Sequence, residues 1–93
     1  EEEREGYLIV KAILRKKVEG IRISERDTKT YFGVLLDDNN RKPLCRLWFN
    51  GNKKYIGLFD DKKNEIKHEL ASLEDIYNHS DQLLKTVDYY SWE

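Results

Sequence analysis

Basic and aromatic side chains gather in the middle of this chain. Residues 39 to 59 contain five basic residues and no acidic one, whereas residues 60 to 93 contain nine acidic and four basic residues. Cations can replace the counterions of a phosphate chain, and flat rings can stack on bases. The pattern therefore predicts a nucleic-acid-binding surface, with the candidate residues Arg41, Lys42, Arg46, Trp48, Lys53, Lys54 and Tyr55.

A second pattern could support metal-dependent hydrolysis. The tripeptide Glu65-Ile66-Lys67 has the Glu-x-Lys form found at the end of many nuclease sites, where the carboxylate holds Mg²⁺, and Asp60 or Asp61 could supply a second carboxylate. Charged residues make up 38% of the chain, so such a tripeptide arises easily by chance. We expect no catalytic residue, metal or cofactor in this chain.

Two further groups are explained better by structure than by chemistry. Asp37, Asp38, Asn39 and Asn40 have the oxygen ligands that Mg²⁺ or Ca²⁺ prefers, but their spacing matches no calcium loop, and a hairpin turn explains the same residues. The single cysteine, Cys45, forms no internal disulfide and is expected to be a small buried hydrophobe.

The two histidines are His68 and His79. Neither has a Ser or Cys neighbour at a spacing typical of nucleophilic catalysis. His68 follows the apolar alternation of its segment, which favours a partly buried side chain over a general base.

Three apolar runs must position the candidate surface. Tyr31–Leu36, Pro43–Phe49 and Tyr55–Phe59 are rich in aromatic and branched residues, and Asn, Asp and Gly fill the segments between them. This spacing predicts a three-stranded antiparallel meander. Side chains of its middle strand alternate between the two faces of the sheet. One face would carry Leu44, Arg46 and Trp48, and the other Cys45, Leu47 and Phe49.

Arg46 marks the first group as the open face of the sheet, with Trp48 partly exposed beside it. Tyr31 or Tyr55 could join that surface, depending on the strand register. The competing interpretation is a solvated basic face with core aromatics.

Helices and outer strands are expected on either side of the meander. Residues 1–17 predict a helix, because acidic residues open it and basic residues close it; a strand over Tyr7–Leu14 is the alternative, but it would bury a lysine. Gly20 is a candidate C-terminal cap residue. Ile21 and Ile23 favour a short edge strand.

The segment after the meander predicts one more strand and one more helix. Glu65–Leu70 alternates as a half-exposed strand. Ser72 and Asp75 form a capping box, and apolar residues at three- and four-residue spacing extend a helix to about Tyr90. We expect an α+β fold, a single domain over residues 1–93, with about four antiparallel strands and the N-terminal and C-terminal helices packed on one face.

Length and charge place the chain in a broad class. Its 93 residues suffice for one domain, and the net charge of −1 and the short apolar runs indicate a soluble, cytoplasmic protein without membrane contact. The chain has no methionine and opens on three glutamates, so we expect an excised piece of a longer protein.

Four stretches carry a family resemblance: RDTKTYFG at 26–33, LLDDNNRKPLCRLWFN at 35–50, KKYIGLFD at 53–60 and SLEDIYNHSDQLL at 72–84. They resemble the C-terminal domain of bacterial type I restriction endonuclease-like proteins, whose N-terminal part is similar to the nuclease region of type I restriction R subunits. The resemblance implies a parent involved in defence or DNA metabolism, with its carboxylates, and any Mg²⁺, upstream of this domain.

Two functions follow as hypotheses. The first is a non-catalytic accessory domain that binds nucleic acid, with DNA as the expected ligand. The rest of the parent chain is its second expected partner. The alternative is a protein-interaction or homodimerisation module that uses the aromatic end Tyr89-Tyr90-Ser91-Trp92. A nuclease acting through Glu65 and Lys67 ranks third.

Overall fold

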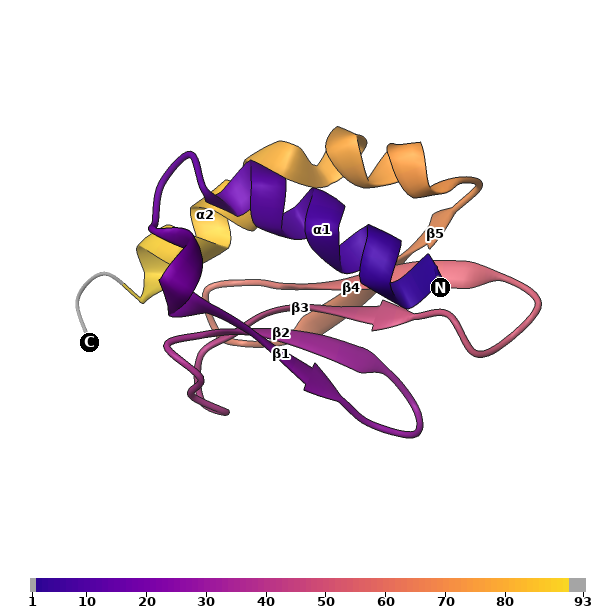
Figure 1. The fold of residues 1–93 in the computed structure, drawn as a ribbon, viewed down its shortest axis with the longest axis horizontal. Helices are drawn as coiled ribbons and strands as arrows, with labels where there is room; N and C mark the ends of the chain where they lie inside the picture. Colours follow the sequence, from indigo (N-terminus) through magenta and orange to yellow (C-terminus); the bar gives the residue numbers. More distant parts are fainter. Residues whose placement is uncertain (1, 91–93) are drawn as a thin grey trace.

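Five antiparallel strands form one sheet in a computed structural model that describes residues 2–90. Neighbours in sequence are neighbours in the sheet, in the order β1 (Ile23–Asp27), β2 (Phe32–Leu36), β3 (Pro43–Trp48), β4 (Lys54–Phe59) and β5 (Glu65–Leu70). The helices α1 (Glu2–Leu14) and α2 (Ser80–Tyr89) lie side by side over one face of the sheet (Figure 1). The expected α+β class is confirmed, with five strands in place of about four.

The extra strand is β1, at the edge of the sheet. Ile23 pairs with Leu36 and is buried, so the segment after Gly20 enters the sheet as a full strand. Ile21 belongs instead to a short 3-10 helix, η1 (Gly20–Arg22), where it is 89% exposed. The predicted weak edge strand therefore starts two residues later than expected.

The N-terminal helix covers the sheet with one apolar stripe. Tyr7, Val10, Ile13 and Leu14 are buried, as the helical interpretation required, while Lys11 stays half-exposed. The helix ends at Leu14, before the basic cluster that was expected to close it. A Cβ at Gly6 would lie 3.1 Å from the side chains of both Leu47 and Phe49, so this glycine lets α1 approach β3 closely.

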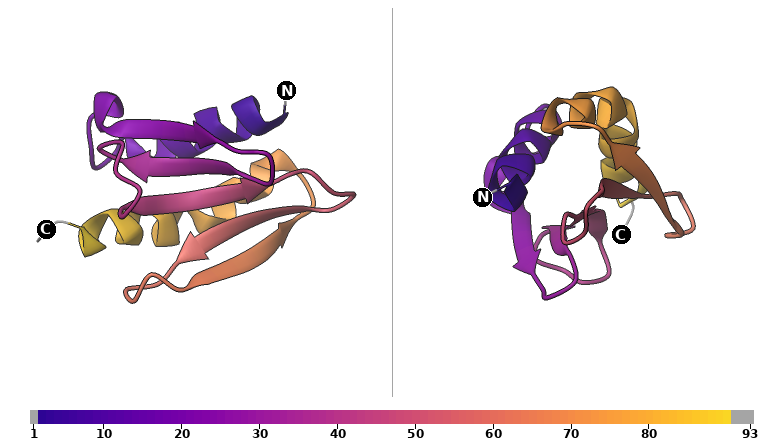
Figure 2. Two further views of the ribbon diagram at one scale, coloured as in Figure 1. Left: turned by 90° about the horizontal axis from the view of Figure 1, so that it is seen from below. Right: turned by 90° about the vertical axis from the view of Figure 1, so that its right-hand side faces the viewer.

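The C-terminal segment is two helices rather than the single one expected. A 3-10 helix, η2 (Leu73–His79), starts at the predicted capping box of Ser72 and Asp75. His79 then leaves helical geometry, with φ −107° and ψ 15°, before α2 begins. Ile76, Leu83 and Val87 are buried nonetheless, so both helices contribute to one core. Both helices lie on the same side of the sheet as α1 (Figure 2).

A β-bulge changes which face Leu44 occupies. Val34 pairs with Cys45, but its neighbour Leu35 pairs with Pro43, which leaves Leu44 as an extra residue in β3. Leu44 and Cys45 are both fully buried in the core. The prediction that Leu44 shares the open face with Arg46 was therefore wrong, because strict alternation ends at a bulge.

Within residues 2–90, none of the helices is both long enough and apolar enough to span a membrane.

Candidate nucleic-acid interface

Three cations stand in one row across the face of the sheet opposite the helices. The strand register sets Arg26, Gly33, Arg46, Gly57 and Lys67 opposite one another, each on a different strand. Directly paired residues point to the same side of a sheet. The row therefore alternates cation, glycine, cation, glycine, cation, and the glycines leave room for the Tyr31 ring over Gly33 and for the Glu65 carboxylate over Gly57.

An aromatic row lies beside the cationic row. Trp48 pairs with Tyr55 across β3 and β4, and the Tyr31 ring packs against Trp48 with 5.0 Å between centroids. The Asn50 side chain donates to the Lys29 carbonyl at 2.7 Å, which ties together the two turns at this end of the sheet. The sheet therefore places three half-buried rings next to the row that contains Arg26, Arg46 and Lys67.

Glu65 crosses the cationic row and is bound by two of its neighbours. Its carboxylate accepts a hydrogen bond from the Trp48 indole at 2.7 Å and one from Arg46 at 3.1 Å. The space comes from Gly57, where a Cβ would overlap Glu65 Oε2 and lie 2.7 Å from its Cδ. Glu65 therefore positions Arg46 and Trp48 on the sheet surface and neutralises much of the arginine charge.

The remaining contacts hold cations against rings. The Arg46 guanidinium carbon lies 4.6 Å from the centroid of the Tyr31 ring and 5.3 Å from that of Phe59. Lys67 Nζ lies 3.6 Å from the centroid of the Trp48 ring. Such contacts favour a defined orientation of each charge. Lys67 is exposed as a residue, and its ammonium lies against the Trp48 indole.

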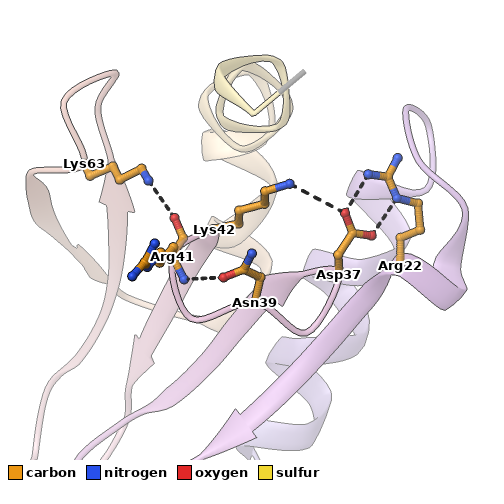
Figure 3. Close-up of polar contacts among 6 residues, drawn as sticks. All are labelled: Arg22, Asp37, Asn39, Arg41, Lys42 and Lys63. Atoms are coloured by element: carbon orange, nitrogen blue, oxygen red, sulfur yellow. Dashed lines mark hydrogen bonds and ion pairs between the residues drawn. The ribbon is translucent and has the colours of Figure 1, made fainter. Parts of the chain in front are cut away.

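The turn between β2 and β3 uses its acidic residues to hold arginines. Asp37 and Asp38 adopt positive φ values of 57° and 54°, which is the conformation that a tight turn requires. Asp37 accepts two hydrogen bonds from Arg22, at 2.7 and 2.8 Å, and these bonds lower the pKa of its carboxyl group (Figure 3). Asp38 accepts one from Arg26 at 2.8 Å. The turn interpretation of this segment is confirmed.

Residues 2–90 contain no group of three or more His, Cys, Asp or Glu that could hold a metal ion. Two of the three carboxylates considered for the alternative nuclease site, Asp60 and Glu65, have separate structural partners. Asp60 accepts backbone hydrogen bonds from Lys62 and Asn64 within its own turn, whereas Glu65 is held by Arg46 and Trp48.

The seven predicted interface residues do not all share this surface. Arg46, Trp48 and Tyr55 share the open face through the strand register. Lys54 pairs with buried Leu70, and its ammonium lies 2.9 Å from Glu2 of α1, which places it on the helix side.

The other three predicted residues lie in turns. Lys42 Nζ lies 4.0 Å from Asp37 Oδ2, and Arg22 approaches the same carboxylate from the opposite side (Figure 3). The Arg41 carbonyl accepts from Lys63, and Arg41 and Lys53 are both exposed.

Arg26 and Lys67 belong to the candidate interface as well, although charge clustering did not identify them. Both belong to outer strands whose local segments contain acidic residues. Strand alternation could have identified them, because each side chain points to the face of its strand opposite the apolar residues. Their alignment with Arg46 depends on the register across all five strands.

No protein-family model matches the chain, and neither does any curated protein or solved structure.

The aromatic end proposed for protein interaction is partly internal. Tyr90 is buried, and its hydroxyl donates to the Pro43 carbonyl at 2.8 Å. Tyr89 is half-buried, and Ser91 and Trp92 lie outside the described residues. Tyr90 therefore closes over the domain's own core.

The two histidines meet beside a cavity of about 350 Å³ between β5 and the C-terminal helices. Their ring centroids are 4.8 Å apart, and both side chains are half-buried, as expected for His68. Burial and the neighbouring His68 lower the pKa of His79 below its ordinary value of 6.5, while Asp75 acts in the opposite direction.

The His79 shift predicts a loss of stability on mild acidification. Because the unfolded state binds the proton more readily, the contribution of His79 is present above about pH 6.5 and is lost as the pH falls through its folded pKa. Urea titrations of the parent and His79→Gln between pH 8 and pH 5 would measure this effect. A parent curve parallel to that of the variant would contradict it.

Cys45 behaves as predicted for a buried hydrophobe. It is fully buried, and desolvation raises the pKa of its thiol far above the ordinary range. A thiol that stays protonated in the core is not a nucleophile.

Proposed function

We propose that this chain is a non-catalytic accessory domain that binds a nucleic-acid strand on the open face of its sheet. The observation that carries the proposal is the pair of rows, with Arg26, Arg46 and Lys67 in one and Tyr31, Trp48 and Tyr55 in the other. A nucleic-acid strand has the same two components, a charged backbone on one side and flat bases on the other.

The dimensions of the sheet support an extended strand. Adjacent strands lie about 4.8 Å apart, so cations on alternate strands are spaced by roughly 9.6 Å. The backbone would follow the cationic row and the bases would reach the neighbouring rings. Single strands suit this surface better than a duplex, because only unpaired bases expose their faces for stacking.

DNA is the first ligand to test. The resemblance to restriction endonuclease-like proteins supports a DNA context, in which the rest of the parent chain would carry out the chemistry and this domain would hold the substrate. Sheet surfaces that bind by stacking also accept RNA, so both polymers belong in the experiment.

Lys67→Gln tests the proposal most directly. Lys67 is exposed on the proposed interface, and Lys54→Gln removes the same charge on the helix side, which makes it the matched control. Fluorescence anisotropy with labelled single-stranded DNA, duplex DNA and RNA would be measured at several salt concentrations. We expect Lys67→Gln to weaken binding to a single strand and to reduce the slope of log K against log salt concentration by about 0.7. Lys54→Gln should leave both the affinity and the slope unchanged.

Two outcomes would contradict the proposal. Absence of binding at low salt, where charges are least screened, would mean that the open face is only a solvated surface. Equal loss in the two lysine variants would mean that net charge, and not this face of the sheet, governs the affinity.

A further inference from the structure

A small recess opens between two arginines of the cationic row. It lies over Gly33, with Arg26 on one side and Arg46 on the other, and has a volume of about 110 Å³. The walls combine the two guanidinium groups with an amide and with apolar or aromatic side chains, from Tyr31, Leu35, Asn40, Pro43 and Cys45. The recess belongs to the same face as the proposed interface.

The guanidinium groups retain capacity for an anion. Arg46 uses one terminal nitrogen on Glu65, and within residues 2–90 its Nε and Nη2 make no hydrogen bond. Arg26 contacts Asp38 and Asn40 from the exposed turn, and an exposed ion pair of this kind contributes little and is readily exchanged. Guanidinium groups match the oxygens of a phosphate bidentately.

The recess suits the phosphate at the end of a strand. Its volume of about 110 Å³ is sufficient for one phosphate group. A terminal phosphate also carries more charge than an internal phosphodiester and leaves only one chain to continue over the rings.

We propose that this recess binds a single terminal phosphate, a phosphomonoester, of the strand that lies on the aromatic row. The inference rests on the proposed function and adds a polarity to it: one end of the strand is anchored between Arg26 and Arg46, and the bases continue toward Trp48. Gly33 is required because a side chain there would displace the Tyr31 ring that lines the recess. A Cβ at this position would already lie 3.2 Å from the Tyr31 ring.

The experiment compares one single-stranded DNA sequence in three forms, with a 5′-phosphate, with a 3′-phosphate and with hydroxyls at both ends. Anisotropy would be measured with the parent chain, Arg26→Gln, Gly33→Ala and Lys67→Gln. We expect one phosphorylated form to bind roughly tenfold more tightly than the unphosphorylated form. Arg26→Gln and Gly33→Ala should abolish that preference, whereas Lys67→Gln should weaken all three forms alike and keep it.

The outcomes separate this inference from the proposed function. If no form binds at low salt, the proposed function fails. If all three forms bind the parent equally, the recess proposal is overturned and the proposed function stands. Thermal stability of the chain would also be measured with inorganic phosphate. Stabilisation by phosphate alone, without any preference among the three DNA forms, would identify a free anion as the ligand and overturn the strand-end proposal. Retention of the preference in Gly33→Ala would also overturn it.

Discussion

Leu44→Ala is expected to lower the free energy of unfolding by about 2–5 kcal/mol. Alternation along β3 predicts an exposed Leu44, for which truncation would change stability by less than about 0.5 kcal/mol. The bulge instead buries the side chain completely in the core. Urea denaturation monitored by tryptophan fluorescence would distinguish the two cases. The total free energy of unfolding is expected to be only about 5–15 kcal/mol, so the larger loss would be a substantial fraction of it.

Leu8→Ala is the matched control for this change. Leu8 belongs to α1 and is 55% exposed, so the same truncation removes little buried surface there. Equal effects of the two substitutions would mean that Leu44 is not in the core and that the strand continues without a bulge.

Gly57→Ala is expected to destabilise the fold by about 1–3 kcal/mol, although alanine usually improves a strand position held by glycine. The new methyl group would occupy the space of the Glu65 carboxylate, which would have to leave Arg46 and Trp48. A half-buried arginine would then lose its partner, and the indole its acceptor.

A double-mutant cycle isolates the cause of that loss. In a Glu65→Ala background the overlapping carboxylate is absent, so Gly57→Ala should cost little there. Gly51→Ala is the control for glycine replacement itself, because the nearest atom to a Cβ at Gly51 is the Lys53 carbonyl at 3.9 Å. A loss for Gly57→Ala that persists without Glu65 would show that the steric conflict lies elsewhere.

The ion pairs revise how the positive charge of this chain should be interpreted. Residues 39–59 carry five bases and no acid. Three of these bases are paired with acids from other segments: Lys42 with Asp37, Arg46 with Glu65 and Lys54 with Glu2. The local excess of charge is therefore largely balanced in three dimensions, and an exposed lysine of β5, Lys67, becomes the clearest test of nucleic-acid binding.

Local sequence determined most elements of the fold and the sides of the central strand beyond its bulge. Asn, Asp and Gly between apolar runs placed the meander, because these residues adopt turn conformations at low cost. Ser72 and Asp75 located the start of the C-terminal helical segment, because a capping box is a contact between near neighbours. Alternation assigned Arg46 and Trp48 to one face and Cys45 and Leu47 to the other, as the structure has them.

Tertiary structure decided what those elements place together. The bulge at Leu44 and the alignment of Arg26, Arg46 and Lys67 depend on how neighbouring strands pair, and no short stretch encodes that register. Glu65 looked like a metal ligand in sequence but is held by an arginine and an indole 19 and 17 residues away. Composition specifies which charges exist, whereas their partners are set by folding, because electrostatic and hydrogen-bond energies depend on distances that only the packed chain defines.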